Sequence, residues 1–533
     1  MHSCSTSPFP PVEIPPIDLW TCLFERPDRP FPASHPLFVN PVSGRSLSFH
    51  EVRQQALHFG QGLQRQWDWQ PGDVLVVFAP NALEVPVVVW GTLAVGGVVC
   101  PINPQYRADE LVHPLIDARA RAIVTTSTQA PVVYEAVARA GLPRDRVILL
   151  DQPSPSWEKG ETAPVAARRP PVRDPDQALA FLVYSSGTTG LPKGVMLSHR
   201  NMVANLLQNA AVDQAQMAWD HDRALGVLPF FHIYGITYLL NYTVYSGVPL
   251  YVLPRFQFAP FCDIIQRHRI TYAYAVPPVI LELVSNPRTA HYDLSSLRLI
   301  VSAAAPLALE LIHAARHQLR LPVRQAYGMS ECAPCTHLQT WSEATSHPGS
   351  VGRLLPNMTS KLAPIEGETG RSKELWLKGP NVFLGYLNNP QATAESFSDD
   401  GYYKTGDVGY EDDQGHFYLT DRLKELIKYN GFQVAPAELE AIALGHPAVA
   451  DVAVTGVPSG QAGTELPRAY VVVANGHAAD PKTGEAIAEF VGERVIGYKK
   501  LRGGVHFVPS IPRNPSGKIL RRELKRLQRE AKL

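Results

Sequence analysis

The sequence has no excess of charge of either sign. Its 533 residues include 49 lysines and arginines and 49 aspartates and glutamates, so the formal net charge is zero. A chain without a strong overall field lacks the long-range attraction that draws basic proteins to nucleic acids and anionic membranes. We therefore expect no nucleic-acid partner. A local basic groove for a small phosphorylated molecule is still compatible with this balance.

Cysteine is also scarce. Six cysteines in a chain of this length do not make a disulfide framework. Cys332 and Cys335 form a single C-x-x-C pair with His337 close behind, and the sequence supplies no second pair of ligands. We interpret the cysteines as reduced thiols rather than as a metal or redox site.

Long apolar runs are few. Residues 1–16 lack a basic region followed by an apolar core, so they do not resemble a secretory signal. The longest uncharged apolar stretch, residues 85–102, is interrupted by Pro86, by Pro101 and by glycines. Its length alone would permit a membrane span. A buried helix that runs into a buried strand explains it better, and we expect a soluble protein without a membrane span.

Short β-branched runs alternate with amphipathic stretches in the first half of the chain. The pattern predicts strands over residues 73–78, 97–101 and 122–126, and helices over residues 83–93 and 110–120. Strand–helix–strand alternation at this spacing is typical of parallel α/β layers. The Pro-, Arg- and Ala-rich residues 152–174 are typical of an exposed connection.

A different alternation begins after residue 424. It predicts helices over residues 436–444 and 484–495, and strands over residues 450–457, 467–473 and 504–509. A unit of about 110 residues is a reasonable size for a separate domain. The predicted fold is therefore a large N-terminal α/β domain of several subdomains followed by a small α+β domain.

The strongest chemical signal is YSSGTTGLPKGVMLSH at residues 184–199. It follows an apolar strand, and its serines, threonines and glycines supply hydroxyls and accessible N–H groups for an anion. Lys193 adds a cation suited to phosphate. No Gly-Lys-Ser/Thr closes the motif, so it is not the common P-loop. The pattern predicts a phosphate-binding loop of another type.

This segment resembles the adenylate-forming superfamily, which comprises acyl-CoA synthetases, firefly luciferases and peptide-synthetase adenylation domains. The resemblance is strongest to the 4-coumarate–CoA ligase branch and extends from about residue 19 to about residue 524. It implies that residues 1–421 bind ATP and the acid and that residues 425–533 move about a hinge at residues 422–424. It also implies that the loop closes over the β- and γ-phosphates of ATP with Ser185, Ser186, Gly187, Thr188, Thr189, Gly190 and Lys193.

Two further motifs match the nucleotide site of that superfamily. QAYGMSE at residues 325–331 implies that Tyr327 stacks on adenine, that Ser330 contacts the α-phosphate and that Glu331, with Thr188, holds Mg²⁺. YKTGD at residues 403–407 implies that Asp407 accepts from the ribose hydroxyls, together with Arg422. The resemblance also assigns to ATP or AMP binding Gln325, Ala326 and Gly328 of the first motif. In the small domain it assigns Gln433 to the same role.

The small domain carries the remaining matches. Lys424 corresponds to the hinge, and Lys428 to a residue of the thiol-transfer arrangement. PSGK at residues 515–518 presents Lys518, which corresponds to the catalytic lysine of the superfamily. A carboxylate that attacks the α-phosphate of ATP brings two anions together, so Lys518 and Mg²⁺ near Glu331 are suited to neutralise the developing charge.

LPFFHIY at residues 228–234 and the alanines near residue 303 match the acid pocket of the superfamily. The resemblance assigns to this pocket His232, Tyr234, Tyr238, Ala303, Ala304 and Ala326. Ala303 and Ala326 replace glycines of the coumarate-type pattern, and Tyr238 replaces a small residue, so each narrows a wall. We expect a smaller aryl acid or a medium-length aliphatic acid. The apolar lining disfavours a dicarboxylate.

The expected reaction is acid plus ATP plus CoA giving acyl-CoA, AMP and pyrophosphate, with ATP, Mg²⁺ and CoA as cofactors. Loading of the acyl group onto a carrier protein is the alternative, and light emission from an oxidised adenylate or acyl binding without catalysis are more remote. The last three residues, 531–533, read Ala-Lys-Leu, which fits the small–basic–Leu address read by the peroxisomal import receptor. We expect a peroxisomal protein, and otherwise a cytoplasmic one.

Overall fold

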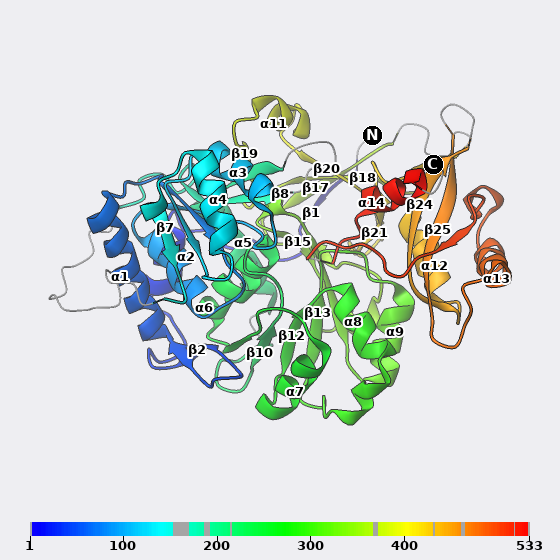
Figure 1. The fold of residues 1–533 in the computed structure, drawn as a ribbon, viewed down its shortest axis with the longest axis horizontal. Helices are drawn as coiled ribbons and strands as arrows, with labels where there is room; N and C mark the ends of the chain where they lie inside the picture. Colours follow the sequence, from blue (N-terminus) through cyan, green and yellow to red (C-terminus); the bar gives the residue numbers. More distant parts are fainter. Residues whose placement is uncertain are drawn as a thin grey trace.

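The computed structural model has a large N-terminal body with a smaller C-terminal unit beside it (Figure 1). It describes residues 3–152, 170–185, 192–213, 216–365, 371–429, 432–459, 464–515 and 517–530. The predicted fold class, a large α/β domain followed by a small α+β domain, is confirmed. Most of the predicted connection at residues 152–174 lies outside the described residues.

The first sheet of the large domain consists mainly of parallel strands that alternate with helices, as the sequence predicted. Its neighbouring strands are, in order, β19 (Gly385–Tyr386), β9 (Lys193–Ser198), β8 (Leu179–Ser185), β5 (Val98–Pro101), β4 (Val74–Phe78), β6 (Ala122–Thr125) and β7 (Val147–Leu149). Its helices are α1 (Phe49–Trp67), α2 (Glu84–Ala94), α3 (Ala108–Asp117), α4 (Ala130–Ala140) and α5 (His199–Asp213). Strands β8 and β9 are antiparallel and flank the predicted phosphate loop.

The apolar residues 85–102 form helix α2 followed by strand β5, and nearly all of their side chains are buried. The prediction of a buried helix leading into a buried strand is confirmed. Within the described parts of the chain, the structure contains no helix with both the length and the apolar character that crossing a membrane requires.

The second sheet places the acid-pocket motifs at the carboxyl ends of parallel strands, where ligands bind in open α/β sheets. Its order is β16 (Arg353–Leu354), β15 (Cys335–Leu338), β14 (Val323–Gly328), β13 (Leu299–Ser302), β12 (Tyr272–Ala275), β10 (Ala224–Gly226), β11 (Leu250–Val252), β2 (Pro36–Val39) and β3 (Ser46–Ser48). Its connections include α6 (Tyr242–Ser246), α7 (Phe258–His268), α8 (Pro277–Ser285), α9 (Leu309–Gln318) and α10 (Glu343–Ser346). A π-helix, η3 (Gly235–Asn241), leads into α6.

The third sheet is antiparallel and lies between the second sheet and the C-terminal unit (Figure 1). Its order is β1 (Ser3–Thr6), β17 (Thr359–Ala363), β18 (Lys373–Lys378), β20 (Tyr403–Glu411) and β21 (Phe417–Arg422), and helix α11 (Pro390–Ser396) precedes β20. In the β20–β21 hairpin, Asp407 lies directly opposite Arg422. This register brings the two predicted ribose-binding residues to one end of the hairpin.

The C-terminal unit has a core of its own. It consists of β22 (Ile427–Tyr429), β23 (Phe432–Val434), α12 (Pro436–Leu444), β24 (Val449–Pro458), β25 (Glu465–Val473), α13 (Pro481–Gly492), β26 (Val505–Phe507) and α14 (Arg521–Glu530). Helices α12 and α13 and strands β24, β25 and β26 correspond to the predicted elements with shifts of a few residues at their ends, whereas β22 and β23 were not predicted. The predicted hinge, residues 422–424, lies between β21 and β22.

Candidate active site

A tyrosine, an aspartate and an arginine form the centre of the site. Strand β14 presents Tyr327, whose hydroxyl donates a hydrogen bond of 2.6 Å to Oδ2 of Asp407. On the other side of the carboxylate, Nε of Arg422 lies 2.9 Å from Oδ1. Burial, and then the charge of Asp407, raise the pKa of Tyr327 well above its ordinary value, so the phenol keeps its proton. The structure thus joins three of the predicted nucleotide contacts in one cluster.

Lys518 from the small domain reaches this cluster. Gly517 before it has a φ of +82°, and a Cβ there would lie 3.2 Å from the side chains of Val276 and Pro278, at the start of α8. A glycine therefore lets the loop approach the large domain closely. Burial, and then the positive charge of Arg422, lower the pKa of Lys518 to about 8, while Glu425 and Asp407 oppose that shift.

The base of the Lys518 loop is fastened within the small domain, and a separate hydrogen bond joins that domain to the large one. Arg521 pairs with Glu425, at 3.0 Å, and with Glu440. Across the domain boundary, Oδ2 of Asp421 in β21 accepts from the backbone N–H of Ala437 in the first turn of α12, at 2.9 Å. These contacts hold the small domain in the orientation that directs Lys518 toward Asp407 and Arg422.

Glu331 lies in a short 3₁₀ turn, η5 (Ser330–Cys332), directly after the strand of Tyr327. Its Oε1 accepts a hydrogen bond of 3.0 Å from the hydroxyl of Tyr386. Burial raises the pKa of Glu331, although the Tyr386 hydroxyl and the charge of Arg422 oppose the shift. Mg²⁺ is usually held by one or two carboxylates together with substrate phosphates. A single recessed carboxylate beside a phosphate loop fits that mode of binding.

Only the ends of the predicted phosphate loop are described. Ser186, Gly187, Thr188, Thr189 and Gly190 lie outside the described residues. Ser185 and Lys193 are paired across the β8–β9 hairpin. The Nζ of Lys193 lies 4.9 Å from the centre of the Tyr386 ring. Sequence analysis missed Tyr386, which sits in no motif that we had recognised.

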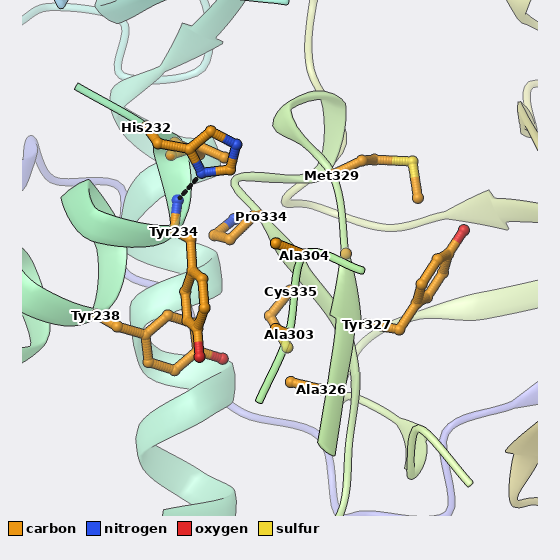
Figure 2. A pocket seen from close by; sticks show the side chains of 12 residues that line it. His232, Tyr234, Tyr238, Ala303, Ala304, Ala326, Tyr327, Met329, Pro334 and Cys335 are labelled. Atoms are coloured by element: carbon orange, nitrogen blue, oxygen red, sulfur yellow. Dashed lines mark hydrogen bonds between the residues drawn. The ribbon is translucent and has the colours of Figure 1, made fainter. Parts of the chain in front are cut away.

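All six residues predicted for the acid pocket line one cavity, whose empty volume of about 330 Å³ includes open space at its mouth. Figure 2 shows His232 at one end of this cavity and Tyr238 at the other, with the alanines on the facing wall. Ala304 has a φ of +74°, a conformation that a non-glycine residue rarely adopts. Further lining residues that the sequence did not assign to the pocket include Met329, Pro334 and Cys335.

His232 is neutral in this setting, because burial lowers its pKa to about 4. Its Nδ1 lies 3.3 Å from the backbone N–H of Tyr234 and accepts from it. The proton of the neutral ring is therefore assigned to Nε2, which makes His232 a hydrogen-bond donor rather than a cation. That donor is suited to an uncharged or anionic oxygen of a bound acid.

The deep wall of the cavity is a group of tyrosine rings whose hydroxyl protons are already used. Tyr238 donates to Oδ1 of Asn209, at 2.5 Å, and Tyr234 to the carbonyl of Val301, at 3.3 Å. The rings of Tyr234 and Tyr238 pack edge to face with their centres 5.2 Å apart. Tyr238 also packs on Tyr274, at 5.5 Å. The wall therefore presents ring carbons to a ligand and is held in place from behind.

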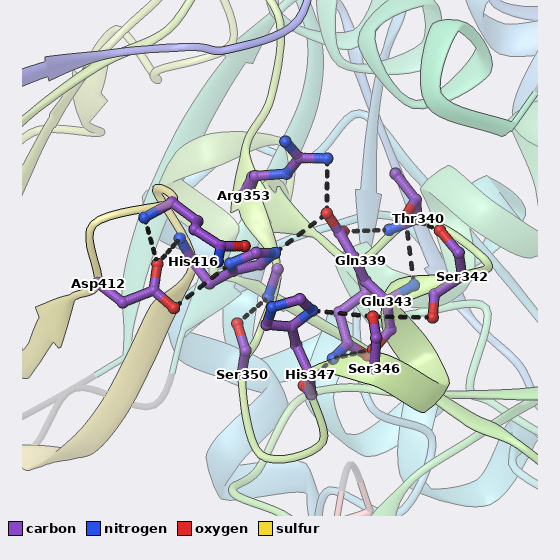
Figure 3. A network of polar contacts seen from close by, with 12 residues as sticks. Gln339, Thr340, Ser342, Glu343, Ser346, His347, Ser350, Arg353, Asp412 and His416 are labelled. Atoms are coloured by element: carbon purple, nitrogen blue, oxygen red, sulfur yellow. Dashed lines mark hydrogen bonds and ion pairs between the residues drawn. The ribbon is translucent and has the colours of Figure 1, made fainter.

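A buried polar network joins strand β14 to the β20–β21 hairpin (Figure 3). The backbone N–H of Gln325 in β14 donates to Oε1 of Gln339, at 2.7 Å. Four residues further on, Glu343 accepts from Arg353 at 2.6 Å and lies 3.1 Å from Nε2 of His416 in the β20–β21 turn. The ring of His416 stacks on His347 at 3.8 Å. The network fixes the distance between the two walls that hold Tyr327 and Asp407.

The other predicted residues have more local roles in this structure. Gln325 is buried and its side chain donates to the carbonyl of Ser350, at 3.0 Å, so it supports the strand. Gly328 is required because a Cβ would lie 2.1 Å from the carbonyl oxygen of Pro334. Lys428 and Gln433 face each other in the β22–β23 ribbon. Lys424 and Lys428 are exposed, and neither belongs to the described cavity lining.

The six cysteines are free thiols, as predicted. Cys332 and Cys335 are both buried, and burial raises the pKa of both thiols. Cys335 donates weakly to the carbonyl of His337, at 3.4 Å, and its side chain forms part of the cavity wall. The C-x-x-C pair therefore contributes to packing around the pocket.

Family models and relatives account for nearly the whole chain. The model of the AMP-binding enzyme family matches residues 24–387, and the model of its C-terminal domain matches residues 438–518. The chain belongs to the AMP-binding enzyme family. As a member it is an AMP-forming acid–CoA ligase with an adenylate intermediate.

Two relatives and one solved structure illustrate the similarity. A probable 4-coumarate–CoA ligase 1 of Dictyostelium discoideum is 36% identical over 512 residues, which cover 92% of each chain. A 4-coumarate–CoA ligase-like 1 protein of Arabidopsis thaliana is 38% identical over 508 residues, covering 92% of this chain and 90% of that one. The ATP-bound crystal structure of MatB from Rhodopseudomonas palustris is 27% identical, with a TM-score of 0.85 over 96% of this chain and 99% of that chain.

Proposed function

We propose that this AMP-forming ligase activates a monocarboxylic acid with a compact apolar tail, with Mg²⁺·ATP as the adenylating substrate. The observation that carries the proposal is the double role of Tyr327. Tyr327 is one of the residues that line the acid cavity, and its hydroxyl donates to Asp407 in the nucleotide cluster. An acid in the cavity and a nucleotide on Asp407 would therefore meet at one residue.

The first step is attack of the acid carboxylate on the α-phosphorus of ATP, with loss of pyrophosphate. Lys518 supplies a cation next to Asp407 and Arg422, where negative charge accumulates on the α-phosphate. Mg²⁺ held by Glu331 and the ATP phosphates would neutralise further charge on the phosphates. His232, as a neutral donor, orients the carboxylate without forming a salt bridge that would weaken it as a nucleophile.

The second step is transfer of the acyl group to the thiol of CoA, with loss of AMP. The adenylate is a mixed anhydride that water hydrolyses, so a closed site favours transfer over hydrolysis. In our proposal the small domain turns about Lys424, withdraws Lys518 and brings Lys428 and the β22–β23 ribbon to the thiol path. A carrier protein is the alternative acceptor of the acyl group, in place of CoA.

The acid is proposed to be a small aryl acid or a medium-length aliphatic acid. The cavity is lined chiefly by alanines, tyrosine rings and Met329, and its described lining includes neither Lys nor Arg to pair with a second carboxylate. A 4-hydroxyl group on an aryl tail would meet the ring carbons of Tyr238 and Tyr234, whose hydroxyls bond to Asn209 and Val301 behind the wall. A buried hydroxyl with poor partners costs about 1–3 kcal/mol, so we expect unsubstituted tails to be preferred.

The test is pyrophosphate release with Mg²⁺·ATP and a panel of aryl and C4–C12 acids, with and without CoA. Release that depends on one acid class and is faster with CoA supports the proposal. Release that CoA does not accelerate, but that a carrier protein does, favours the alternative acceptor. Faster turnover of 4-coumarate than of cinnamate would contradict the proposed preference for an unsubstituted tail.

We also propose delivery to the peroxisome by the terminal tripeptide at residues 531–533, which lies outside the described residues. The support is the sequence pattern alone. A fluorescent protein fused to the N-terminus of the full chain should give a punctate pattern that overlaps a peroxisomal marker. Deletion of the tripeptide should make the fusion diffuse, and an unchanged pattern after deletion would contradict the proposal.

A further inference from the structure

One side chain contacts both the cation of the phosphate loop and the recessed carboxylate. The ring of Tyr386 lies under the ammonium of Lys193, whose Nζ is 4.9 Å from the ring centre. The hydroxyl of the same residue donates to Oε1 of Glu331, at 3.0 Å. Lys193 and Glu331 are 138 positions apart in the sequence, and Tyr386 belongs to a third region of the chain. No family motif that we identified in the sequence includes this tyrosine.

The backbone around Tyr386 joins the same two regions. Strand β19 pairs with the strand that begins at Lys193, and Tyr386 lies opposite Val195. On the other side, the backbone N–H of Phe383 donates to the carbonyl of Glu331, at 2.8 Å. The N–H of Tyr386 itself donates to Oγ1 of Thr393, at 2.9 Å. These backbone contacts do not involve the Tyr386 side chain, so changes to that side chain should leave the strand in place.

The ring and the hydroxyl of Tyr386 have separable effects. A cation over an aromatic face is attracted by the ring quadrupole, so the ring favours one position of the Lys193 ammonium. A hydroxyl that donates to a carboxylate orients it and leaves the second oxygen of Glu331 available. The first contact acts on ATP through Lys193, whereas the second acts through Glu331, the group that is suited to Mg²⁺.

We propose that Tyr386 is a positioning residue that places Lys193 for the ATP phosphates through its ring and Glu331 for the metal through its hydroxyl. The inference rests on the proposed use of Mg²⁺·ATP. It adds to that function a residue that sets the two charged groups relative to each other before the nucleotide binds. Tyr386 touches neither the acid nor the reacting atoms in this assignment.

The test compares Tyr386→Phe and Tyr386→Leu in the full-length protein by calorimetric titration with ATP, first in EDTA and then at increasing Mg²⁺. The phenylalanine variant keeps the ring and loses the hydroxyl. It should bind metal-free ATP within about twofold of the wild type, whereas the Mg²⁺ concentration that gives half of the metal-dependent gain in affinity should rise about tenfold. The leucine variant should in addition bind metal-free ATP about threefold to tenfold more weakly.

Tyr402→Phe is the matched control, because the Tyr402 hydroxyl contacts Cys4 and Thr359 and lies outside this arrangement. It should match the wild type in both titrations. A phenylalanine variant with wild-type Mg²⁺ dependence would overturn the role of the hydroxyl. Equal weakening of metal-free ATP binding in both Tyr386 variants, with a common fall in Tm, would show a merely structural role and overturn the proposal.

Failure of the inference and failure of the proposed function are distinguishable. Thioester formation by the wild-type protein tests the function and requires no variant. The calorimetric titrations measure ATP binding without catalysis, so they remain informative whatever acid the enzyme prefers. A wild-type protein that makes acyl-CoA while the Tyr386 variants bind ATP normally would contradict the inference alone.

Discussion

The nucleotide half and the acid half of the site are built on different principles. Asp407, Arg422 and Lys518 form a cluster of opposite charges that comes from two domains. The acid cavity is instead bounded by alanines and tyrosine rings whose polar atoms point into the protein. The first half specifies a reaction through charge, and the second specifies a substrate through shape. Changes in the two halves should therefore alter different kinetic constants.

The largest effect is expected from Lys518→Ala, which removes a cation from the charge cluster. Loss of one group that stabilises developing charge typically lowers kcat by about 10²–10³. Burst measurements of acyl-AMP should show this loss, while transfer from preformed acyl-AMP to CoA should be much less affected. Lys428→Ala is the control for adenylation and should form acyl-AMP at the wild-type rate. The assignment of Lys518 is wrong if Lys518→Ala also adenylates at that rate.

Asp407→Asn should raise the KM for ATP by about tenfold to a hundredfold, because charge-assisted hydrogen bonds contribute about 1.5–3 kcal/mol. It removes the charge that Arg422 faces and weakens the acceptor for the ribose hydroxyls. The KM for the acid should change little. Asp413→Asn, at an exposed position in the turn of the same hairpin, serves as the control in steady-state assays of both substrates. A larger change in the acid KM than in the ATP KM would break the distinction between the halves.

Tyr238→Ala should act on the acid alone. Removal of the ring opens the deep wall, so the preferred chain length should increase and kcat/KM for the longest acids should rise about tenfold. Competition assays with mixed acids would measure the shift directly. Tyr274→Phe changes a ring behind this wall and should leave the preference as it is. An unchanged preference in the Tyr238 variant would place the end of the pocket elsewhere.

The pH dependence of adenylation should also distinguish the nucleotide half from the acid half, with a smaller effect than the substitutions above. Burial and Arg422 lower the pKa of Lys518 to about 8, so its cation is lost as the pH rises through that value. The value of kcat/KM for adenylation should then fall by about half near pH 8 and continue downward, because this constant reports groups of the free enzyme. His232, with a pKa of about 4, stays neutral near pH 8 and should therefore cause no further change in kcat/KM in this pH range. A profile that is flat up to pH 9.5 would contradict the role of Lys518.

The charged half was largely predictable from the sequence, because its groups occur in ordered motifs. Asp407 and Arg422 were assigned together to the ribose hydroxyls, and the hairpin register places them opposite each other. Tyr386 was not predictable, since its role depends on a short strand that joins two distant segments. The same holds for Glu343 and His416, which meet only after α10 and the β20–β21 hairpin have packed.

The acid half was predictable in its residues but not in its polarity. The six pocket residues were identified from the family pattern, and all of them line the cavity. The sequence did not reveal that Tyr238 donates to Asn209, because these residues belong to different helices. That hydrogen bond engages the hydroxyl of Tyr238, so the residue contributes its ring to the wall of the cavity.

The central claim is that one site first makes an acyl-adenylate and then passes the acyl group to CoA. The most direct measurement is a single-turnover reaction with Mg²⁺·ATP and an accepted acid, quenched and analysed by mass spectrometry. The account predicts that acyl-AMP accumulates without CoA and converts to acyl-CoA and AMP when CoA is added. Acyl-CoA formed without an intervening acyl-AMP, or with ADP and phosphate as products, would contradict it.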